Sequence, residues 1–295
     1  MSDGPVVSAI VVNFNVKGLL VDTLRSLFAT TAVPLEVIVV DNASSDGSAD
    51  AVAEEFPQVR LIRSAENLGF GKANNLGFQY AAGRFVLLLN PDVVLEPGCV
   101  DRLADFLLVH PEAGGVGPRL TRPDGALDLA ARRGFPTPRA SFYRFTGLSR
   151  AFPRSRRFNR YNLGYEREDA VHEIDSGTAA CLMVRRQAID RVGLFDPDFF
   201  MYGEDLDLCF RLRAGGWKID YLPVAQALHV KGQATRQATA RMLYAFHSAM
   251  WTFHHKHYAS DLPAFVNGLV WASIWGRWAA LSIRARLTSD PRVSR

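Results

Sequence analysis

The stretch EVIVVDNASSDGS, residues 36–48, joins a short run of apolar, β-branched residues to a loop of small polar and acidic side chains. An apolar run of this length is typical of a strand that is buried on both faces of a sheet. Two other apolar runs end in the same way, before Asn13-Phe14-Asn15 and before Asn90-Pro91-Asp92. Because ligands of open α/β sheets bind outside the carboxyl ends of the strands, these polar residues mark the expected site.

Patterns in the first 90 residues alternate between strand and helix. We expect strands over residues 6–12, 36–40, 59–63 and 84–89, and helices over residues 17–30, 48–56 and 72–82. Strands that alternate with helices predict an α/β fold with a mostly parallel sheet and right-handed crossover connections. The polar residues after the four strands are then expected to converge on one rim of the sheet.

The second half of the chain is less regular. Residues 110–170 lose periodicity and gain Pro, Gly and Arg, which predicts a long loop-rich insertion. Further patterns predict a strand at the end of residues 174–184, helices over 186–192 and in the second half of 193–211, and a strand over 218–222. A tail that begins near residue 224 contains two helix patterns, over residues 235–257 and 263–287.

Composition excludes several classes of protein. With 295 residues, 48% of them hydrophobic and 22% charged, the chain is typical of a globular protein and not of a disordered or collagen-like one. Three scattered cysteines are too few for a disulfide framework or a zinc cluster. The N-terminus lacks a basic segment ahead of a long apolar run, so we expect no signal peptide and a cytoplasmic location.

Positive charge is concentrated in one segment. The net charge is +4, yet nine arginines and no acidic residue lie between Asp128 and Glu166, so the rest of the chain carries −5. The segment suits an anionic partner such as a phosphate, an anionic membrane surface or nucleic acid, and the alternative is a solvated loop. We see no aromatic interleaving of the kind that stacks bases, so nucleic acid is not expected. The arginines are Arg132, Arg133, Arg139, Arg144, Arg150, Arg154, Arg156, Arg157 and Arg160.

Two common nucleotide-binding folds are excluded by their missing signatures. A dinucleotide-binding domain needs a glycine-rich turn after the first strand, where this chain has Asn13-Phe14-Asn15, and no GxxxxGK[ST] loop is present. Gly69 and Gly71 precede the helix pattern at residues 72–82, where they allow backbone N–H groups to approach a phosphate.

Five segments together resemble glycosyltransferase family 2, whose members are inverting enzymes with the GT-A fold. They also resemble its bacterial rhamnosyltransferase-like branch. The segments are VSAIVVNFN, EVIVVDNASSDGS, ENLGFGKANNLGF, FVLLLNPDV and GLFDPDFFMYGEDLDLCFRLRAGGW, in the order of the family. The resemblance covers about residues 6–230. It implies a GT-A domain over residues 1–230, a Rossmann-like nucleotide-diphospho-sugar transferase fold, with an Arg-rich insertion at about 129–165. A helical extension over residues 231–295 follows.

The resemblance implies a donor site for a nucleoside diphosphate sugar, dTDP-rhamnose or a UDP-sugar. Asp41 matches the acid that binds the pyrimidine base, whose ring N–H a carboxylate accepts; the alternative is an Asp that only forms a turn. The family often has an Arg-Asn pair where this chain has Asn74 and Asn75, with Lys72 as a replacement for the arginine. The implied donor residues are Asn13, Asn15, Asp41, Asn42, Gly69, Gly71, Lys72, Asn74, Asn75 and Asn90.

The resemblance also implies a divalent cation. Asp92 matches the last acid of the family's DxD motif, and Asn90 stands where the first acid is missing. Mg²⁺ or Mn²⁺ is expected to use Asp92 together with diphosphate oxygens and waters. His229 sits where the family often has a further ligand; the alternative is a packed histidine at a strand end.

Catalysis is expected at the pair Glu204-Asp205. Asp205 matches the family's base, which takes the proton of the acceptor hydroxyl as the new C–O bond forms. Attack opposite the leaving group inverts the anomeric centre, so one base suffices. Thr178, Tyr202, Arg211 and Trp217 are the expected acceptor residues. For Arg211 the alternative is pairing with a nearby acid, and for Trp217 a place in the core.

The implied function is transfer of a sugar to a glycan or a polyprenyl-diphosphate-linked acceptor in cell-envelope polysaccharide synthesis. Peripheral contact with the inner face of the membrane fits the arginine-rich segment. It also fits a tail helix with Trp271, Trp275 and Trp278 on one face. Packing of that face on the domain or on a second copy, as in a homodimer, is the alternative. A non-catalytic sugar-nucleotide-binding relative and a sugar nucleotidyltransferase are the competing functions; the Gly-rich signature of the latter is absent.

Overall fold

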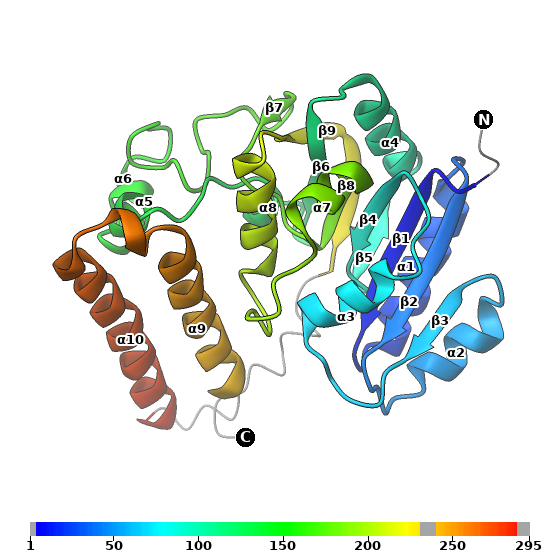
Figure 1. Ribbon diagram of the computed structural model, residues 1–295, viewed down its shortest axis with the longest axis horizontal. Helices are drawn as coiled ribbons and strands as arrows, with labels where there is room; N and C mark the ends of the chain where they lie inside the picture. Colours follow the sequence, from blue (N-terminus) through cyan, green and yellow to red (C-terminus); the bar gives the residue numbers. More distant parts are fainter. Residues whose placement is uncertain (1–3, 231–239, 288–295) are drawn as a thin grey trace.

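The computed structural model describes residues 4–230 and 240–287, which form one nine-stranded sheet flanked by helices (Figure 1). The strands run in the order β3-β2-β1-β4-β8-β6-β9-β5, and β7 pairs with β9 outside this path. Their bounds are β1 (Val7–Asn13), β2 (Leu35–Asp41), β3 (Arg60–Arg63), β4 (Phe85–Leu89), β5 (Val93–Leu95), β6 (Ala113–Thr121), β7 (His172–Glu173), β8 (Cys181–Arg185) and β9 (Lys218–His229).

The first four strands confirm the expected parallel α/β arrangement. β1 pairs in parallel with β2 and β4, and β2 pairs in parallel with β3. Asn13 lies directly opposite Asp41 in the register of β1 and β2. Because all four strands point the same way, the polar residues that follow them meet at one edge of the sheet.

The second half of the sheet is mixed, and three of its strands, β5, β6 and β7, were not predicted from the sequence. β8 is antiparallel to β4 and β6, whereas β6 is parallel to β9. The prediction of a loop-rich segment over residues 110–170 is wrong at its start, because β6 occupies Ala113–Thr121. Its sequence AGGVGPRLT lacks the run of apolar residues that predicts a buried strand, because glycines stand in their place. Glycine is needed there for close packing, since a Cβ on Gly114 would lie 2.6 Å from the Cβ of Trp217.

Two further expectations are corrected. The tail does not begin near Val224, because β9 continues without a break to His229. The third helix begins at Phe70 and ends at Phe78, earlier than the expected range 72–82. The helices are α1 (Lys17–Thr30), α2 (Ser48–Glu55), α3 (Phe70–Phe78), α4 (Cys99–Val109), α5 (Pro138–Phe145), α6 (Leu148–Ala151), α7 (Arg186–Val192), α8 (Glu204–Ala214), α9 (Ala240–His257) and α10 (Ala264–Leu287).

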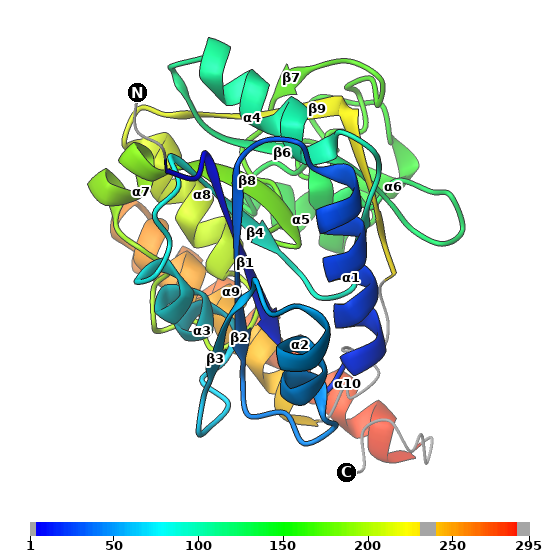
Figure 2. The same cartoon turned by 90° about the vertical axis from the view of Figure 1, so that its right-hand side faces the viewer.

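Helices cover both faces of the sheet, which explains why its central strands are continuous apolar runs. Ala9 and Val11 of β1 point into a core shared with α1, α2 and α4. Ile10 and Val12 point into the opposite core, shared with α3, α7 and α8. Figure 2 shows α1 and α2 on one side of β1 and β2, with α3 on the other.

The tail forms a helical hairpin that docks beside α8 (Figure 1). Phe253 of α9 packs against Phe199 and Phe210, and His257 Nε2 of α9 donates to Oδ1 of the buried Asp207 at 2.8 Å. Two of the three tail tryptophans face α9, because Trp275 and Trp278 contact the ring of Tyr244. In residues 4–230 and 240–287, no helix has an apolar stretch that is long enough to cross a membrane.

Candidate active site

Asp41 is held at the end of β2 by its neighbours across the sheet. Its Oδ1 accepts from Asn13 Nδ2 at 3.1 Å, and its Oδ2 accepts from the backbone N–H of Ser44 at 3.1 Å. Asn13 and Asp41 are both buried. Asn15 has a left-handed backbone, φ 54°, and its Oδ1 accepts from the N–H of Ser45 at 2.7 Å, which fixes the loop after β2. Asp41 therefore points its carboxylate along the strand end, and Asn15 shapes the loop.

The loop before α3 is built around Gly69. Asn42 accepts from the N–H of Leu68 at 2.9 Å and donates to Asn67, so it positions this loop. Gly69 has φ 81°, and a Cβ there would lie 2.4 Å from the carbonyl oxygen of Phe200. Only glycine fits this contact, which brings the N-terminus of α3 against the loop that leads into α8.

Two expected nucleotide contacts have structural partners instead. Asn75 Nδ2 donates to the carbonyl oxygen of Phe195 at 2.8 Å, and its Oδ1 accepts from the N–H of Phe195 at 3.0 Å. Asn74 Nδ2 donates to the carbonyl oxygen of Phe70 at 3.0 Å. Both amides hold α3 and its neighbouring loop, and their contact with a nucleotide stays a prediction. Lys72, on the first turn of α3, is exposed.

Asp92 and His229 meet after β4 and at the end of β9, and a third residue joins them. His229 Nε2 lies 3.3 Å from Asp92 Oδ1, and His229 Nδ1 lies 3.0 Å from Asp128 Oδ2. All three side chains are buried. Burial by itself would lower the pKa of His229, but its hydrogen bonds to Asp128 and Asp92 raise that pKa on balance.

This group fits the partial cation site that the sequence implies. Neighbouring ligand atoms around an ion with bonds of about 2.1 Å are roughly 3 Å apart, close to the separation of His229 Nε2 and Asp92 Oδ1. A carboxylate on the other ring nitrogen, as Asp128 supplies, is the usual support of a ligating histidine. Within the described residues, no set of three His, Cys, Asp or Glu side chains is arranged to hold an ion by itself. Oxygens of a bound diphosphate would complete the coordination.

Glu204 and Asp205 form the first turn of α8, directly after Tyr202 and Gly203, whose backbones are left-handed. Asp205 Oδ2 accepts from Arg133 at 2.7 Å, and its Oδ1 accepts from the N–H of Leu206 at 2.8 Å. Glu204 is buried beneath α3, with its Cβ 3.8 Å from the position that a Cβ on Gly71 would take.

The two adjacent acids have different environments. Burial raises the pKa of Glu204 to about 8, helped by the charge of Asp205 beside it, so Glu204 is mostly neutral at pH 7. Burial alone would lower the pKa of Arg133, but Asp205 raises it above the usual value. Glu204 thus stays protonated at pH 7, while the side chain of Asp205 lies against Arg133 at the head of α8.

A chain of contacts joins these groups at one edge of the sheet. Arg133, which bonds Asp205, also donates to the carbonyl oxygen of Gly177 at 3.3 Å. Three residues further on, the carbonyl oxygen of Ala180 accepts from the N–H of Asn90 at 2.9 Å. Asn13 Oδ1, Asn90 Oδ1 and Glu204 Oε2 are buried atoms without a hydrogen-bond partner in the described part of the chain. Unsatisfied buried oxygens that gather at one rim are typical of a site for a polar ligand.

The expected acceptor residues divide into two pairs. Arg211 bonds Asp207 at 2.8 Å and donates to the carbonyl oxygens of residues 192–194, and Trp217 is packed in the core against Gly114. Both side chains thus make the structural contacts that were the stated alternatives for them, and their role as acceptor residues stays a prediction. Thr178 and Tyr202 are half-buried near the head of α8, and the ring of Tyr202 contacts Phe246 of α9.

Sequence reasoning missed Arg133 and Asp128 as members of the site. Arg133 was counted only as one charge of the arginine run, and Asp128 only as the boundary of that run. Asp128 Oδ1 caps the short 3-10 helix Leu129–Ala131 by accepting from the N–H of Ala130, and Arg133 follows two residues after this helix. The one signal in the sequence is an acid five residues before an arginine, which is too common to single out.

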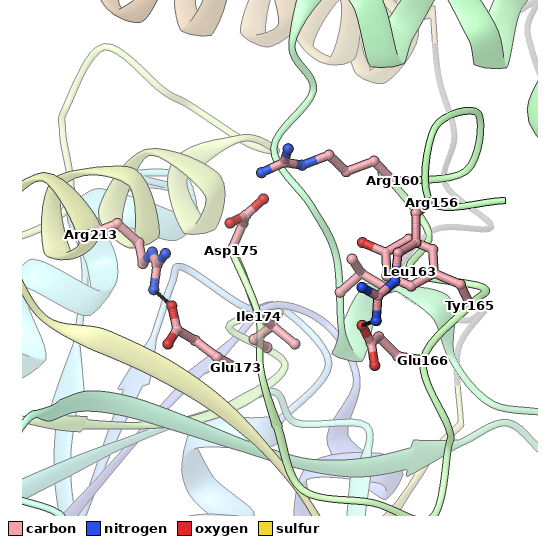
Figure 3. A pocket seen from close by; sticks show the side chains of 9 residues that line it. All are labelled: Arg156, Arg160, Leu163, Tyr165, Glu166, Glu173, Ile174, Asp175 and Arg213. Atoms are coloured by element: carbon pink, nitrogen blue, oxygen red, sulfur yellow. Dashed lines mark hydrogen bonds and ion pairs between the residues drawn. The ribbon is translucent and has the colours of Figure 1, made fainter.

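The rest of the arginine-rich insertion lies on the surface. Seven of its nine arginines are exposed, and several stack on aromatic rings of the same segment, so aromatic residues do alternate with the charges. A cavity of about 350 Å³ lies under this segment, with Arg160 pointing toward Asp175 across it (Figure 3). Arg156 pairs with Glu166 and Arg213 with Glu173 at its walls. None of the donor, cation or catalytic residues lines this cavity.

Comparison with solved structures defines the class of the fold. A mannosyltransferase from Pyrobaculum calidifontis, solved with GDP-Man and Mn²⁺, matches with a TM-score of 0.59 and 18% identity over 97% of this chain and 76% of that one. Residues 1–349 of S. aureus TarS match with a TM-score of 0.58 and 16% identity over 97% and 77% of the two chains. The fold is therefore the GT-A fold of glycosyltransferases.

Comparison of sequences gives the family. Residues 8–193 match the model of "Glycosyl transferase family 2". An N-acetylglucosaminyl-diphospho-decaprenol L-rhamnosyltransferase of Mycobacterium tuberculosis (strain CDC 1551 / Oshkosh) is 35% identical over 244 residues, which are 78% of each chain. The chain belongs to glycosyltransferase family 2 and is a glycosyltransferase of its rhamnosyltransferase-like branch. A non-catalytic sugar-nucleotide-binding protein is not favoured by these matches.

Proposed function

We propose that this glycosyltransferase moves one sugar, with inversion, from a nucleoside diphosphate donor to an N-acetylglucosaminyl-diphospho-polyprenol acceptor. L-Rhamnose from dTDP-rhamnose is the proposed sugar, and UDP-sugars are the competing donors. The observation that carries this proposal is the match to the mycobacterial rhamnosyltransferase, whose name states that acceptor and that sugar, over 78% of both chains.

Donor binding is assigned to the carboxyl ends of β1, β2 and β4. The Asp41 carboxylate, fixed by Asn13 and Ser44, accepts the ring N–H of a thymine or uracil base. The backbone at Gly69 and Gly71 lies at the N-terminus of α3, where N–H groups favour a phosphate, and Lys72 adds positive charge. Asn90 offers its unpaired buried oxygen to the sugar or the diphosphate.

The chemical step needs one base and one leaving group. Asp205 accepts the proton of the acceptor hydroxyl while that oxygen attacks the anomeric carbon of the donor sugar. The C–O bond to the nucleoside diphosphate breaks on the opposite face, and its electron pair leaves with the diphosphate. Glu204, neutral and buried, adds no second negative charge next to Asp205.

Asp92 and His229 are the residues that would hold a divalent cation, with Asp128 fixing the imidazole. A bound Mg²⁺ or Mn²⁺ would supply positive charge for the leaving diphosphate. The chain's own contribution is to keep both ligating atoms buried and a contact distance apart.

A peripheral position on a membrane is part of the proposal. The insertion exposes Phe142, Phe145 and Phe152, with 58%, 72% and 51% of their surfaces accessible. Exposed arginines surround them and no acid interrupts residues 129–165. Aromatic side chains beside positive charge suit the interface of an anionic lipid surface, where the lipid-linked acceptor would lie.

The test is a transfer assay with purified protein and a panel of nucleotide sugars, including dTDP-rhamnose and UDP-sugars. The acceptor is a synthetic GlcNAc-diphospho-polyprenol, and Mg²⁺ and Mn²⁺ are supplied separately. We expect glycosylated product with one donor and its loss after EDTA treatment. Product that forms equally well after chelation would contradict the cation site, and no transfer with any donor would contradict the proposed reaction.

A further inference from the structure

The insertion reaches the catalytic centre through one buried side chain. Arg133 donates to Asp205 Oδ2 at 2.7 Å, and only 13% and 14% of the two side chains are accessible. The other arginine at this end of the insertion behaves differently. Arg132 donates to the carbonyl oxygens of residues 166 and 167 and lies over the ring of Tyr221. It therefore fastens the insertion to strand β9 of the sheet, whereas Arg133 fastens it to helix α8.

Arg133 is fixed at both its backbone and its head. Its N–H donates to the carbonyl oxygen of Ser176 at 2.9 Å, and its own carbonyl oxygen accepts from the N–H of Ser176 at 2.9 Å. The guanidinium also contacts the carbonyl oxygen of Gly177 and the hydroxyl of Tyr161. An arginine whose backbone and donors are fixed in this way sets the place of the carboxylate that it bonds.

The charged groups around Asp205 show why its pairing with Arg133 matters. The titratable and charged groups that face Asp205 are Arg133 from the insertion and Glu204 and Cys209 from α8; Tyr161 of the insertion lies against Arg133. Arg133 is the one cation in this set. Without it, a carboxylate at the head of α8 would face only an acid, a thiol and a phenol.

We propose that Arg133 is the positioning residue of the base: it holds Oδ2 of Asp205, so that Oδ1, whose other contact is with the N–H of Leu206, turns toward the acceptor hydroxyl. This inference rests on the proposed role of Asp205 in sugar transfer. It makes the insertion a working part of the catalytic centre, separate from any contact with lipid.

The first test compares pH–rate profiles of the wild type and Arg133→Gln with the best donor and acceptor. Loss of a paired cation makes the charged form of a carboxylate less favourable, so the acid limb of kcat/KM should move to higher pH. We expect kcat at pH 7 to fall roughly 10- to 100-fold, the lower end of what a misplaced base costs, with the donor KM unchanged. Arg133→Lys should recover part of the rate.

Chemical rescue separates the guanidinium from the fold of the insertion. Guanidinium ion at millimolar concentration should restore part of the activity of Arg133→Ala and none of the activity of Asp205→Asn. Arg132→Gln is the matched control, because it removes a neighbouring arginine that is still more deeply buried and whose contacts are with residues 166–167 and Tyr221. It should lower the melting temperature without moving the acid limb. An acid limb that stays in place in Arg133→Gln would overturn the inference.

A stability cycle tests the pair without any assay of transfer. Arg133→Gln, Asp205→Asn and the double variant are unfolded in urea. If the pair is formed, the double variant should be more stable than the two single changes predict, by at least about fivefold in the unfolding constant. Additive effects would overturn the inference. A cycle with coupling but no transfer from any donor would instead contradict the proposed function alone.

Discussion

Glu204 and Asp205 are neighbours in sequence with opposite tasks in the same turn of α8. Asp205 accepts a hydrogen bond from Arg133, whereas Glu204 is buried without a partner for Oε2 and its pKa rises to about 8. Separation of two adjacent acids by environment is how a site keeps one carboxylate ready as a base without building up repulsion.

Asp205→Asn should abolish proton transfer from the acceptor and leave the donor site intact. We expect kcat to fall by roughly 10²–10⁴, and the affinity for the nucleoside diphosphate, measured by calorimetry, to stay within about twofold. Wild-type turnover in this variant would mean that another group is the base.

Glu204 should make stability depend on pH. Between its ordinary pKa of 4.5 and about 8, the folded protein keeps a proton that the unfolded chain has lost. The contribution of Glu204 to the free energy of unfolding should therefore be greatest below pH 4.5. It should fall as the pH rises toward 8, by up to about 1.4 kcal/mol per pH unit. Glu204→Gln should remove this slope in urea unfolding between pH 5 and 8. The exposed Glu66→Gln is the control and should keep it; an unchanged slope in Glu204→Gln would contradict the assignment.

Among the elements, α3 and the loop before α8 depend on each other. Asn75 joins α3 to Phe195, Phe70 donates to the carbonyl oxygen of Phe200, and Gly69 makes room for that contact. The donor side and the catalytic side of the site are thus joined through residues that were expected to touch only the nucleotide.

Gly69→Ala should damage both stability and donor binding. The new Cβ meets a backbone oxygen and adopts a left-handed backbone, which together cost about 1–3 kcal/mol. We expect a lower urea midpoint and a several-fold higher donor KM. Gly125→Ala is the matched control, because φ is 76° there but nothing lies within 4 Å of a Cβ. If both variants lose stability equally, backbone strain alone is responsible and the contact with Phe200 is unimportant.

Elements with a local signal were predicted well from the sequence, and those defined by tertiary contact were not. The bounds of α1 and α7 were predicted correctly, because their apolar spacing and flanking residues mark them. β6 was missed because glycines that accommodate Trp217 and the sheet replace the usual apolar residues. In the site, the motif residues were found from their family pattern. Arg133 and Asp128 were not, because their roles come from contacts 72 and 101 residues away in sequence.

At the scale of the whole molecule, positive charge gathers on the insertion and leaves the rest of the protein acidic. Of the tail tryptophans, expected to lie at a membrane or an interface, Trp275 and Trp278 pack on α9, whereas Trp271 is exposed together with Phe265 and Leu269. The insertion differs from this tail surface because it combines exposed phenylalanines with a run of arginines, which is why we propose it as the surface that meets anionic lipid.

Sedimentation with vesicles tests this surface. We expect binding to vesicles that contain anionic lipid, weakening at high salt, and little binding to neutral vesicles. Replacement of Phe142, Phe145 and Phe152 by serine should weaken binding roughly tenfold or more. Replacement of Leu108 and Val109, which are exposed elsewhere, should not. Self-association that depends on these phenylalanines, with no vesicle binding, would point to a second copy of the chain instead.

The short segment from Asp128 to Arg133 touches both halves of the chemistry, since Asp128 supports His229 and Arg133 supports Asp205. The end of the insertion also braces this segment, because Tyr161 contacts Arg133 and the carbonyl oxygens of residues 166 and 167 accept from Arg132. Exchange of residues 136–160 between members of the family, with 161–170 kept, would then replace the surface proposed to meet lipid as a cassette, while the groups proposed to make and break bonds stay in register.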